Sequence, residues 1–126
     1  SNVVFKVQPI AVAYGDAALL SLLWFNVIDN AVKFLALNQA PQIEIGSYTQ
    51  GNEIIYYTRD NGVGFDMANS HTMFNIFKRL HGTKNFEGRG LGLAIVKQIA
   101  LRHNGRVWAE GNVGQGASIY FALPQH

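Results

Sequence analysis

The sequence has no cysteine, only three prolines and few charged residues, which make up 14% of its 126 positions. Without cysteine, the chain can form neither a disulfide scaffold nor a zinc site with thiolate ligands. Its low charge and its 48% content of apolar residues exclude a disordered tail and a coiled coil. A chain of this length can bury about two-thirds of its unfolded surface, so we expect one folded domain.

Long apolar runs and basic clusters are missing as well. No apolar stretch approaches the roughly 18 residues that a membrane span requires, and no signal-peptide pattern opens the chain. The formal net charge is only +2, and no more than two Lys or Arg residues are adjacent. These absences predict a cytoplasmic protein that contacts neither nucleic acid nor membrane.

Glycine is abundant by comparison. The chain has 13 glycines, and ten of them lie between Gly62 and Gly116 at irregular spacings. Such clustering indicates turns that need positive φ, or loops where the backbone must approach a ligand closely.

Periodic patterns of apolar residues predict the secondary structure. Apolar residues at helical spacing predict one helix from 17 to about 37, capped by Asp16, and another over 91–103. Alternation predicts short strands at 3–7, near 11–14, and at 42–48, 53–58, 106–110 and 117–123. The sum is an α/β fold: a two-layer α/β sandwich whose helices pack on one face of a mixed, mostly antiparallel sheet.

The stretch 65–89 shows little periodicity beyond a short helical segment expected around 73–80. A connection of this length is usually functional, such as a lid. On the helix that follows, we expect three apolar side chains to point inward: Ile95, Val96 and Ile99.

A polar stripe lies on the first helix. Asn26, Asn30 and Lys33 are spaced at i, i+4 and i+7, which places them on one stripe that we expect to point away from the core. Amide oxygens suit Mg²⁺ beside phosphate oxygens, and lysine supplies a point charge for phosphate. An ordinary solvated helix face carries the same residue types, so the stripe alone leaves both interpretations open.

The segment 60–64, Asp-Asn-Gly-Val-Gly, directly follows a predicted strand. A buried Asp60 carboxylate there could accept a hydrogen bond from an exocyclic amino group such as that of adenine, and Gly62 and Gly64 would let the base lie close to the backbone. A plain Asp-Asn-Gly turn fits the same residues.

The segment 88–92, Gly-Arg-Gly-Leu-Gly, leads straight into the second helix, whose N-terminus favours an anion such as phosphate. Leu93 stands where a dinucleotide-binding fingerprint needs glycine, and no strand precedes the segment. A P-loop is excluded because no Gly-Lys-Ser/Thr follows. A glycine-rich turn with a purely structural role remains an equal alternative.

Taken together and in this order, the stripe 26–33, the segment 60–64 and the segment 88–94 resemble the catalytic ATP-binding domain of sensor histidine kinases, over essentially the whole chain. Residues 74–77 resemble the phenylalanine-containing lid box of that family, and 114–124 its closing strand. The run 76–82, together with Glu87, is most similar to the phytochrome-type branch.

The resemblance implies the Bergerat ATP-binding fold as a single domain over 1–126, a fragment of a longer kinase, with a lid over about residues 66–89. It implies ATP and Mg²⁺ as ligands, with Asn30 as the metal ligand, Asn26 assisting and Lys33 contacting phosphate. Asn30 and Lys33 are the candidate catalytic residues. Asp60 would recognise the adenine amino group in a pocket shaped by Gly62 and Gly64. The other implied nucleotide contacts are Phe77, Arg79, Gly88, Arg89, Gly90, Leu91 and Gly92.

Asn26 bears on whether the domain is a kinase or a hydrolase. The fold also resembles gyrase-type and chaperone-type ATPases, in which a glutamate one turn before the metal-binding Asn is the base for water. An amide cannot accept a proton at neutral pH, so Asn26 favours phosphoryl transfer over hydrolysis. The resemblance then implies transfer of the γ-phosphoryl group to a histidine on a separate dimerisation and phosphoacceptor domain, with a response regulator downstream.

None of the four histidines is followed by Glu or Asp, as the family's acceptor histidine usually is. We therefore expect surface or capping roles for them, and little turnover from this chain alone. They are His71, His81, His103 and His126. A second hypothesis is a degenerate nucleotide-binding or partner-binding platform without kinase activity. Its only support is the low charge and Arg89, which stands where the family commonly has a small or hydroxylated residue.

Overall fold

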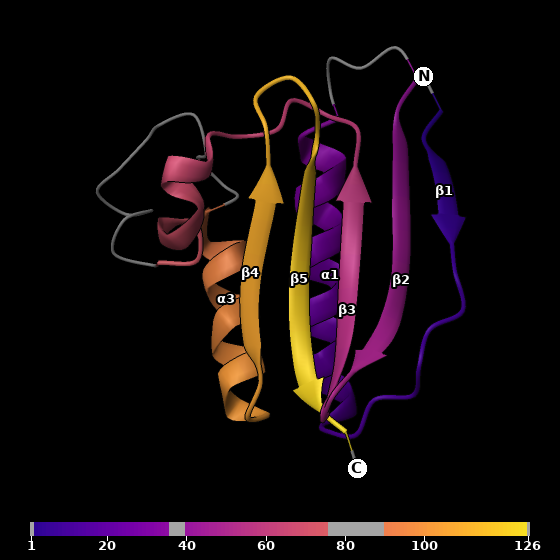
Figure 1. Cartoon of the computed structure of the whole chain (residues 1–126), viewed down its shortest axis with the longest axis vertical. Helices are drawn as coiled ribbons and strands as arrows, with labels where there is room; N and C mark the ends of the chain where they lie inside the picture. The colour runs from indigo at the N-terminus through magenta and orange to yellow at the C-terminus, as the bar shows by residue number, and fades with distance from the viewer. Residues whose placement is uncertain (1, 36–39, 76–89, 126) are drawn as a thin grey trace.

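The computed structural model of the chain describes residues 2–35, 40–75 and 90–125, and its centre is a five-stranded sheet in the order β1-β2-β3-β5-β4 (Figure 1). The strands are β1 (Val4–Val7), β2 (Gln42–Gln50), β3 (Glu53–Asp60), β4 (Arg106–Gly111) and β5 (Ala117–Pro124). β1 pairs with β2 in parallel, and the other neighbours pair antiparallel. The predicted mixed, mostly antiparallel sheet is confirmed.

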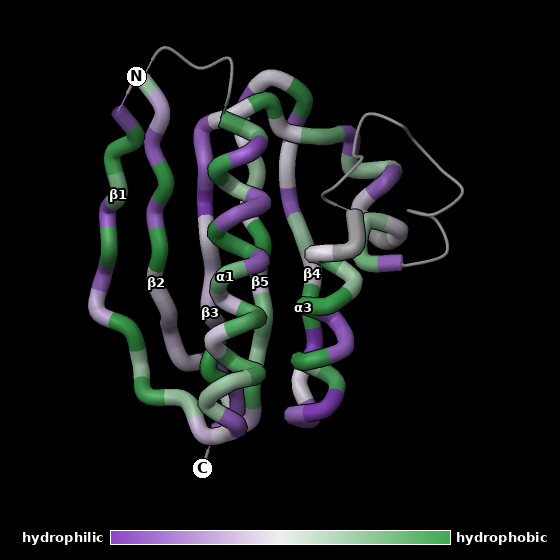
Figure 2. The backbone as a smooth tube through the Cα atoms, turned by 180° about the vertical axis from the view of Figure 1, so that it is seen from behind, coloured by the Kyte–Doolittle hydropathy of each residue, from purple (hydrophilic) through white to green (hydrophobic). Residues whose placement is uncertain are grey.

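In the described part of the chain, two helices cover one face of this sheet. Figures 1 and 2 show helix α1 (Ala17–Lys33) and helix α3 (Gly90–Arg102) on the same side, seen from opposite directions. A short 3-10 helix, η1 (Met67–Thr72), packs beside β4. The predicted two-layer α/β sandwich is therefore confirmed. In the parts of the chain that are described, no helix has both the length and the apolar character needed to cross a membrane.

Aromatic packing between the layers forms the centre of the core. The rings of Tyr56 on β3 and Phe121 on β5 stack with centroids 5.0 Å apart, and Trp24 of α1 meets both rings edge-on. Side chains alternate between the two faces of a strand, so the even-numbered residues of β3 face the helices with Tyr56. Thr58 and Asp60 therefore belong to the helix-facing side of β3.

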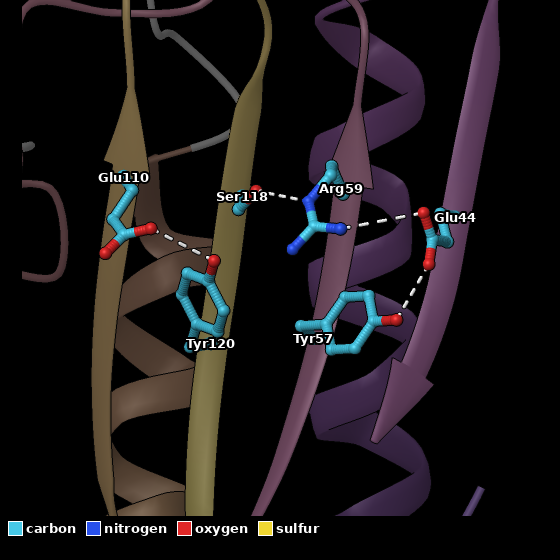
Figure 3. Close-up of polar contacts among 6 residues, drawn as sticks. All are labelled: Glu44, Tyr57, Arg59, Glu110, Ser118 and Tyr120. Atoms are coloured by element: carbon cyan, nitrogen blue, oxygen red, sulfur yellow. Dashed lines mark hydrogen bonds and ion pairs between the residues drawn. The ribbon is translucent and has the colours of Figure 1, made fainter. Parts of the chain in front are cut away.

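Among the described residues, no helix covers the opposite sheet face, and side chains of the sheet itself cover its rings (Figure 3). The Tyr57 hydroxyl donates to Glu44 at 2.8 Å, and the Arg59 guanidinium lies 4.9 Å from the centre of the Tyr57 ring. The Tyr120 hydroxyl donates to Glu110 at 3.0 Å. Both tyrosines are buried by these contacts, so the apolar part of this face is largely hidden from water.

Two predicted element boundaries are wrong. No strand forms near 11–14, because the N–H of Ala11 donates to the Ser47 hydroxyl and its carbonyl accepts from the Tyr56 hydroxyl, in place of a strand ladder. Helix α1 ends at Lys33 rather than near 37. At this end, the N–H of Phe34 donates back to the carbonyls of Asn30 and Val32. The segment 36–39 lies outside the described residues.

The region after β3 and the face of α3 also differ from expectation. Ahead of the helical segment expected around 73–80, the structure has the short helix η1 at Met67–Thr72, which Asp66 caps, and 73–75 lie outside any helix. Residues 76–80 lie outside the described part of the chain. On α3, Val96 and Ile99 are buried as predicted, but Ile95 is 38% exposed, because it lines an open pocket with Leu19 and Leu22 of α1.

His103 connects the ends of the two helices. Its Nε2 accepts from the N–H of Asp16 at 3.0 Å, and its Nδ1 lies 2.9 Å from the carbonyl oxygen of Ile99. Because Nε2 accepts, Nδ1 carries the proton and donates to Ile99. Asp16 in turn caps α1 by accepting from the N–H of Leu19. His103 thus has a capping role that links the start of α1 to the end of α3.

We expect His103→Phe to lower the free energy of unfolding by about 1 kcal/mol, because the ring is kept while both hydrogen bonds are lost. Urea denaturation followed by circular dichroism measures this change. Arg102→Lys, an exposed neighbour that keeps its charge, serves as the control and should unfold like the parent chain. A phenylalanine variant as stable as the parent would contradict the linking role of His103.

Candidate functional site

Asp60 is the last residue of β3 and is only 6% exposed. Its Oδ1 accepts the N–H of Gly62 at 2.9 Å. Burial raises the pKa of this carboxyl group above the usual aspartate range, and hydrogen bonds from the backbone of Gly62 and Ala117 offset part of that rise. No charged side chain of the described residues is among the causes of this shift, and a buried carboxylate gains from a hydrogen-bond donor, so Asp60 is suited to receive one from a ligand.

The two glycines after Asp60 are required by close backbone packing. A Cβ on Gly62 would clash with the carbonyl oxygen of Phe34, at the end of α1. Gly64 has φ +69°, and a Cβ there would clash with the carbonyl oxygen of Asn112. The loop after β3 is thereby held against α1 on one side and the β4–β5 turn on the other, which keeps Asp60 in one position.

The polar stripe of α1 does not point away from the core as expected. Asn30 is only 7% exposed, and Asn26 is half-buried. For Asn26 the reason is that α3 packs along α1, because a Cβ on Gly92 would lie 2.9 Å from Oδ1 of Asn26. Within the described residues, the Asn30 amide group makes no hydrogen bond, so its oxygen is available to a ligand. The amide nitrogen of Asn26 donates to the carbonyl of Leu22 at 2.8 Å.

Lys33 lies at the exposed end of the stripe. Its Nζ is 2.9 Å from Oδ2 of Asp29, one turn earlier, and both side chains are more than a third exposed. A surface pair of this kind contributes about 0.3–0.5 kcal/mol, so a phosphate group could draw Lys33 away from Asp29 at little cost.

Helix α3 begins at Gly90, and its first turn contains no acidic residue. The amide N–H groups of a first helical turn have no partner within the helix, and the helix dipole favours an anion there. Gly90, Leu91 and Gly92 supply such groups. The other predicted contacts of this region lie outside the described residues: Phe77, Arg79, Gly88 and Arg89.

Helix α1 connects the two halves of the site. Its middle meets the first turn of α3 through Asn26 and Gly92, and its end meets the loop after Asp60 through Phe34. Asn30 lies one turn from each of these contacts. Eight residues of helix span about 12 Å, which is enough to separate the base of a nucleotide from its phosphates. The described residues contain no group of three or more His, Cys, Asp or Glu side chains that could hold a metal by themselves.

Sequence reasoning missed one group near Asp60. Thr58 is 1% exposed, and its hydroxyl has no hydrogen-bond partner among the described residues. The sequence does contain a signal for Thr58: side chains alternate between the two faces of a strand, so position 58 lies on the same face as Asp60.

Comparison with known proteins identifies relatives of this fold and site. Residues 15–126 match the family model "Histidine kinase-, DNA gyrase B-, and HSP90-like ATPase". The chain is 41% identical over 117 residues to cyanobacterial phytochrome A from Nostoc sp., a match that covers 93% of this chain and 15% of that protein. The chain thus spans only a small part of the curated relative it matches.

Solved structures resemble the fold over nearly its whole length. The mycobacterial sensor histidine kinase MprB superposes with a TM-score of 0.76 at 28% identity, covering 97% of this chain and 80% of that one. Full-length ShkA, in complex with AMPPNP, gives a TM-score of 0.76 at 27% identity, covering 97% of this chain and 25% of that one.

The raised pKa of Asp60 predicts a pH-dependent stability for the nucleotide-free chain. The folded state holds the proton more tightly than the unfolded state, so the stability from this group is present below the ordinary aspartate pKa and is lost as pH rises through the raised value. Asp60→Asn is neutral and avoids that loss. We expect the free energy of unfolding of this variant, minus that of the parent, to be larger at pH 7 than at pH 3. Urea denaturation at the two pH values measures this difference. An offset that does not change with pH would contradict the raised pKa.

Proposed function

The chain belongs to the histidine kinase-, DNA gyrase B- and HSP90-like ATPase family, and we propose that it binds Mg-ATP and donates the γ-phosphoryl group to a histidine. One observation carries this proposal. Helix α1 contacts both the loop after the buried Asp60 carboxylate and the first turn of α3, which favours an anion. The relatives named as sensor histidine kinases support the same activity.

Base recognition would rest on Asp60. Its carboxylate suits the exocyclic amino group of adenine, which donates a hydrogen bond. Guanine presents a carbonyl oxygen at the corresponding position, and two acceptors facing each other in a buried site are unfavourable. The carboxylate is buried and fixed by Gly62, so it cannot turn away to accommodate the wrong base.

Phosphate and metal binding would rest on α1 and on the first turn of α3. The Asn30 amide oxygen is a neutral, hard donor of the kind that Mg²⁺ accepts, and the phosphates would supply further oxygen ligands. Sharing the metal ligands between Asn30 and the phosphates fits a site that has no acidic metal cluster among the described residues. Bound Mg²⁺ would neutralise phosphate charge. The unpaired amides at the start of α3 and the Nζ of Lys33 would position the phosphates.

Phosphoryl transfer is favoured over hydrolysis by Asn26. Its amide nitrogen is engaged with Leu22, and its oxygen faces Gly92, so the side chain offers no group that takes a proton from water. Protein positioning and charge neutralisation then carry most of the catalysis. The acceptor would be a histidine on a dimerisation and phosphoacceptor domain of the same full-length protein, with a response regulator downstream. A domain with these partners would act in the cytoplasm.

We expect calorimetric titration to show ATP binding that Mg²⁺ strengthens, and we expect Asn30→Ala to lose the Mg²⁺ effect while still binding ATP, because only the metal ligand is removed. Asn52→Ala, in the exposed β2–β3 turn, is the matched control and should behave as the parent. If the folded parent binds no ATP or ADP at millimolar concentration, the proposal fails and a partner-binding platform becomes the better account. If Asn30→Ala keeps the full Mg²⁺ effect, the metal ligand lies elsewhere.

A further inference from the structure

Thr58 carries a buried hydroxyl that the fold itself does not use. The residue is 1% exposed, and within the described part of the chain its Oγ1 is the only buried side-chain polar atom without a hydrogen-bond partner. An unpaired buried group of this kind lowers the stability of the fold. Valine has nearly the same shape and suits a strand equally well, so the hydroxyl indicates a polar partner that the folded chain does not supply.

The neighbours of Thr58 narrow the choice of partner. In the sheet register, Thr58 lies between Ile45 of β2 and Ile119 of β5, and both are apolar and buried. Asp60 likewise lies between Ile43 and Ala117. Cross-strand side chains therefore cannot satisfy either polar group. On the same face of β3, Thr58 is flanked by Tyr56 and Asp60, and the Tyr56 hydroxyl already donates to the carbonyl of Ala11. Asp60 is therefore the polar neighbour along β3 that can still accept a hydrogen bond.

The separation along β3 favours a bridged contact over a direct one. Residues two apart on one face of a strand are separated by about 7 Å, which is too far for a direct hydrogen bond between short side chains. A single water molecule with hydrogen bonds of about 2.8 Å to each group joins oxygen atoms about 5.6 Å apart, the separation left when two short side chains extend toward each other from backbone positions about 7 Å apart. Asp60 retains acceptor capacity for such a water, because Oδ1 takes the Gly62 N–H and a carboxylate has several further lone pairs.

We propose that Thr58 is a positioning residue for base recognition: its hydroxyl and the Asp60 carboxylate hold one buried water between them, which orients the carboxylate toward the base. The Thr58 hydroxyl donates to the water, and the water donates to Asp60. This arrangement satisfies the hydroxyl and adds a hydrogen bond to the charged form of Asp60. The effect on the base rests on the proposed nucleotide function, but the link between Thr58 and Asp60 does not.

The forces that act on the Asp60 carboxyl group make the link measurable. Its pKa is raised by burial and lowered by backbone N–H groups, and no charged side chain of the described residues is among the causes of its shift. A hydrogen bond from the proposed water stabilises the ionised form. Removing the Thr58 hydroxyl should therefore raise the pKa of Asp60 further, an effect that a merely structural role of Thr58 would not produce.

The test uses Thr58→Val, which removes the hydroxyl, and Thr58→Ser, which keeps it. Carbon-13 NMR follows the Asp60 carboxyl titration in the nucleotide-free chain, and calorimetry measures ADP affinity. We expect the valine variant to raise the pKa of Asp60 and to weaken ADP binding about tenfold, as for loss of one buried hydrogen bond to a charged group. The serine variant should stay close to the parent in both measurements. If the valine variant does not fold, Thr58→Ala removes the same hydroxyl.

The outcomes separate the two proposals. If the valine variant leaves both the Asp60 pKa and the ADP affinity unchanged while the parent binds ADP, the role of Thr58 is overturned and the nucleotide function stands. If the Asp60 pKa rises in that variant but the parent binds no ADP, the link between Thr58 and Asp60 stands and the nucleotide function fails. A serine variant that behaves like valine would also overturn the role of the hydroxyl.

Discussion

The packing of Trp24 against the sheet is the interaction on which the candidate site depends. The indole ring of Trp24 meets Tyr56 and Phe121 edge-on, while those two rings stack on each other. This contact sets the rotation of α1 about its axis. With Trp24 inward, Asn26 comes beside the first turn of α3, Asn30 is buried one turn later, and the end of the helix reaches the loop after Asp60. A rotated helix would separate all three.

The polar groups of the site lower the stability of the empty fold. Asp60 is a buried carboxylate whose pKa is raised by desolvation, and the buried Thr58 hydroxyl has no hydrogen-bond partner within the described residues. Each of these groups would have a lower free energy in water, and an apolar side chain in its place would make the empty fold more stable. A well-packed core rarely contains polar groups that the fold leaves unsatisfied. Such groups mark functional sites, where a ligand completes the interactions.

Much of this arrangement is predictable from the sequence because local patterns determine it. The alternation of β3 and β5, the Asp16 cap and the order of the polar motifs all follow from spacing along the chain. The burial of Asn30 and the partial exposure of Ile95 do not, because both depend on tertiary packing. The strand expected near 11–14 fails for a similar reason, since hydrogen bonds from Ser47 and Tyr56 reach Ala11 from distant parts of the chain. The sequence predicts that Gly62 and Gly64 let a base lie close to the backbone. The structure also gives them a packing role, which only tertiary structure reveals.

The central claim is that one adenine nucleotide spans from Asp60 to the first turn of α3, along α1. Amide NMR spectra recorded during titration with Mg-ATP test it most directly, through the signals of Gly62 and Gly92. The account predicts that both signals shift together, with the same apparent affinity, and that Mg-GTP at equal concentration shifts them far less. Shifts confined to one of the two signals, or equal responses to ATP and GTP, would contradict it.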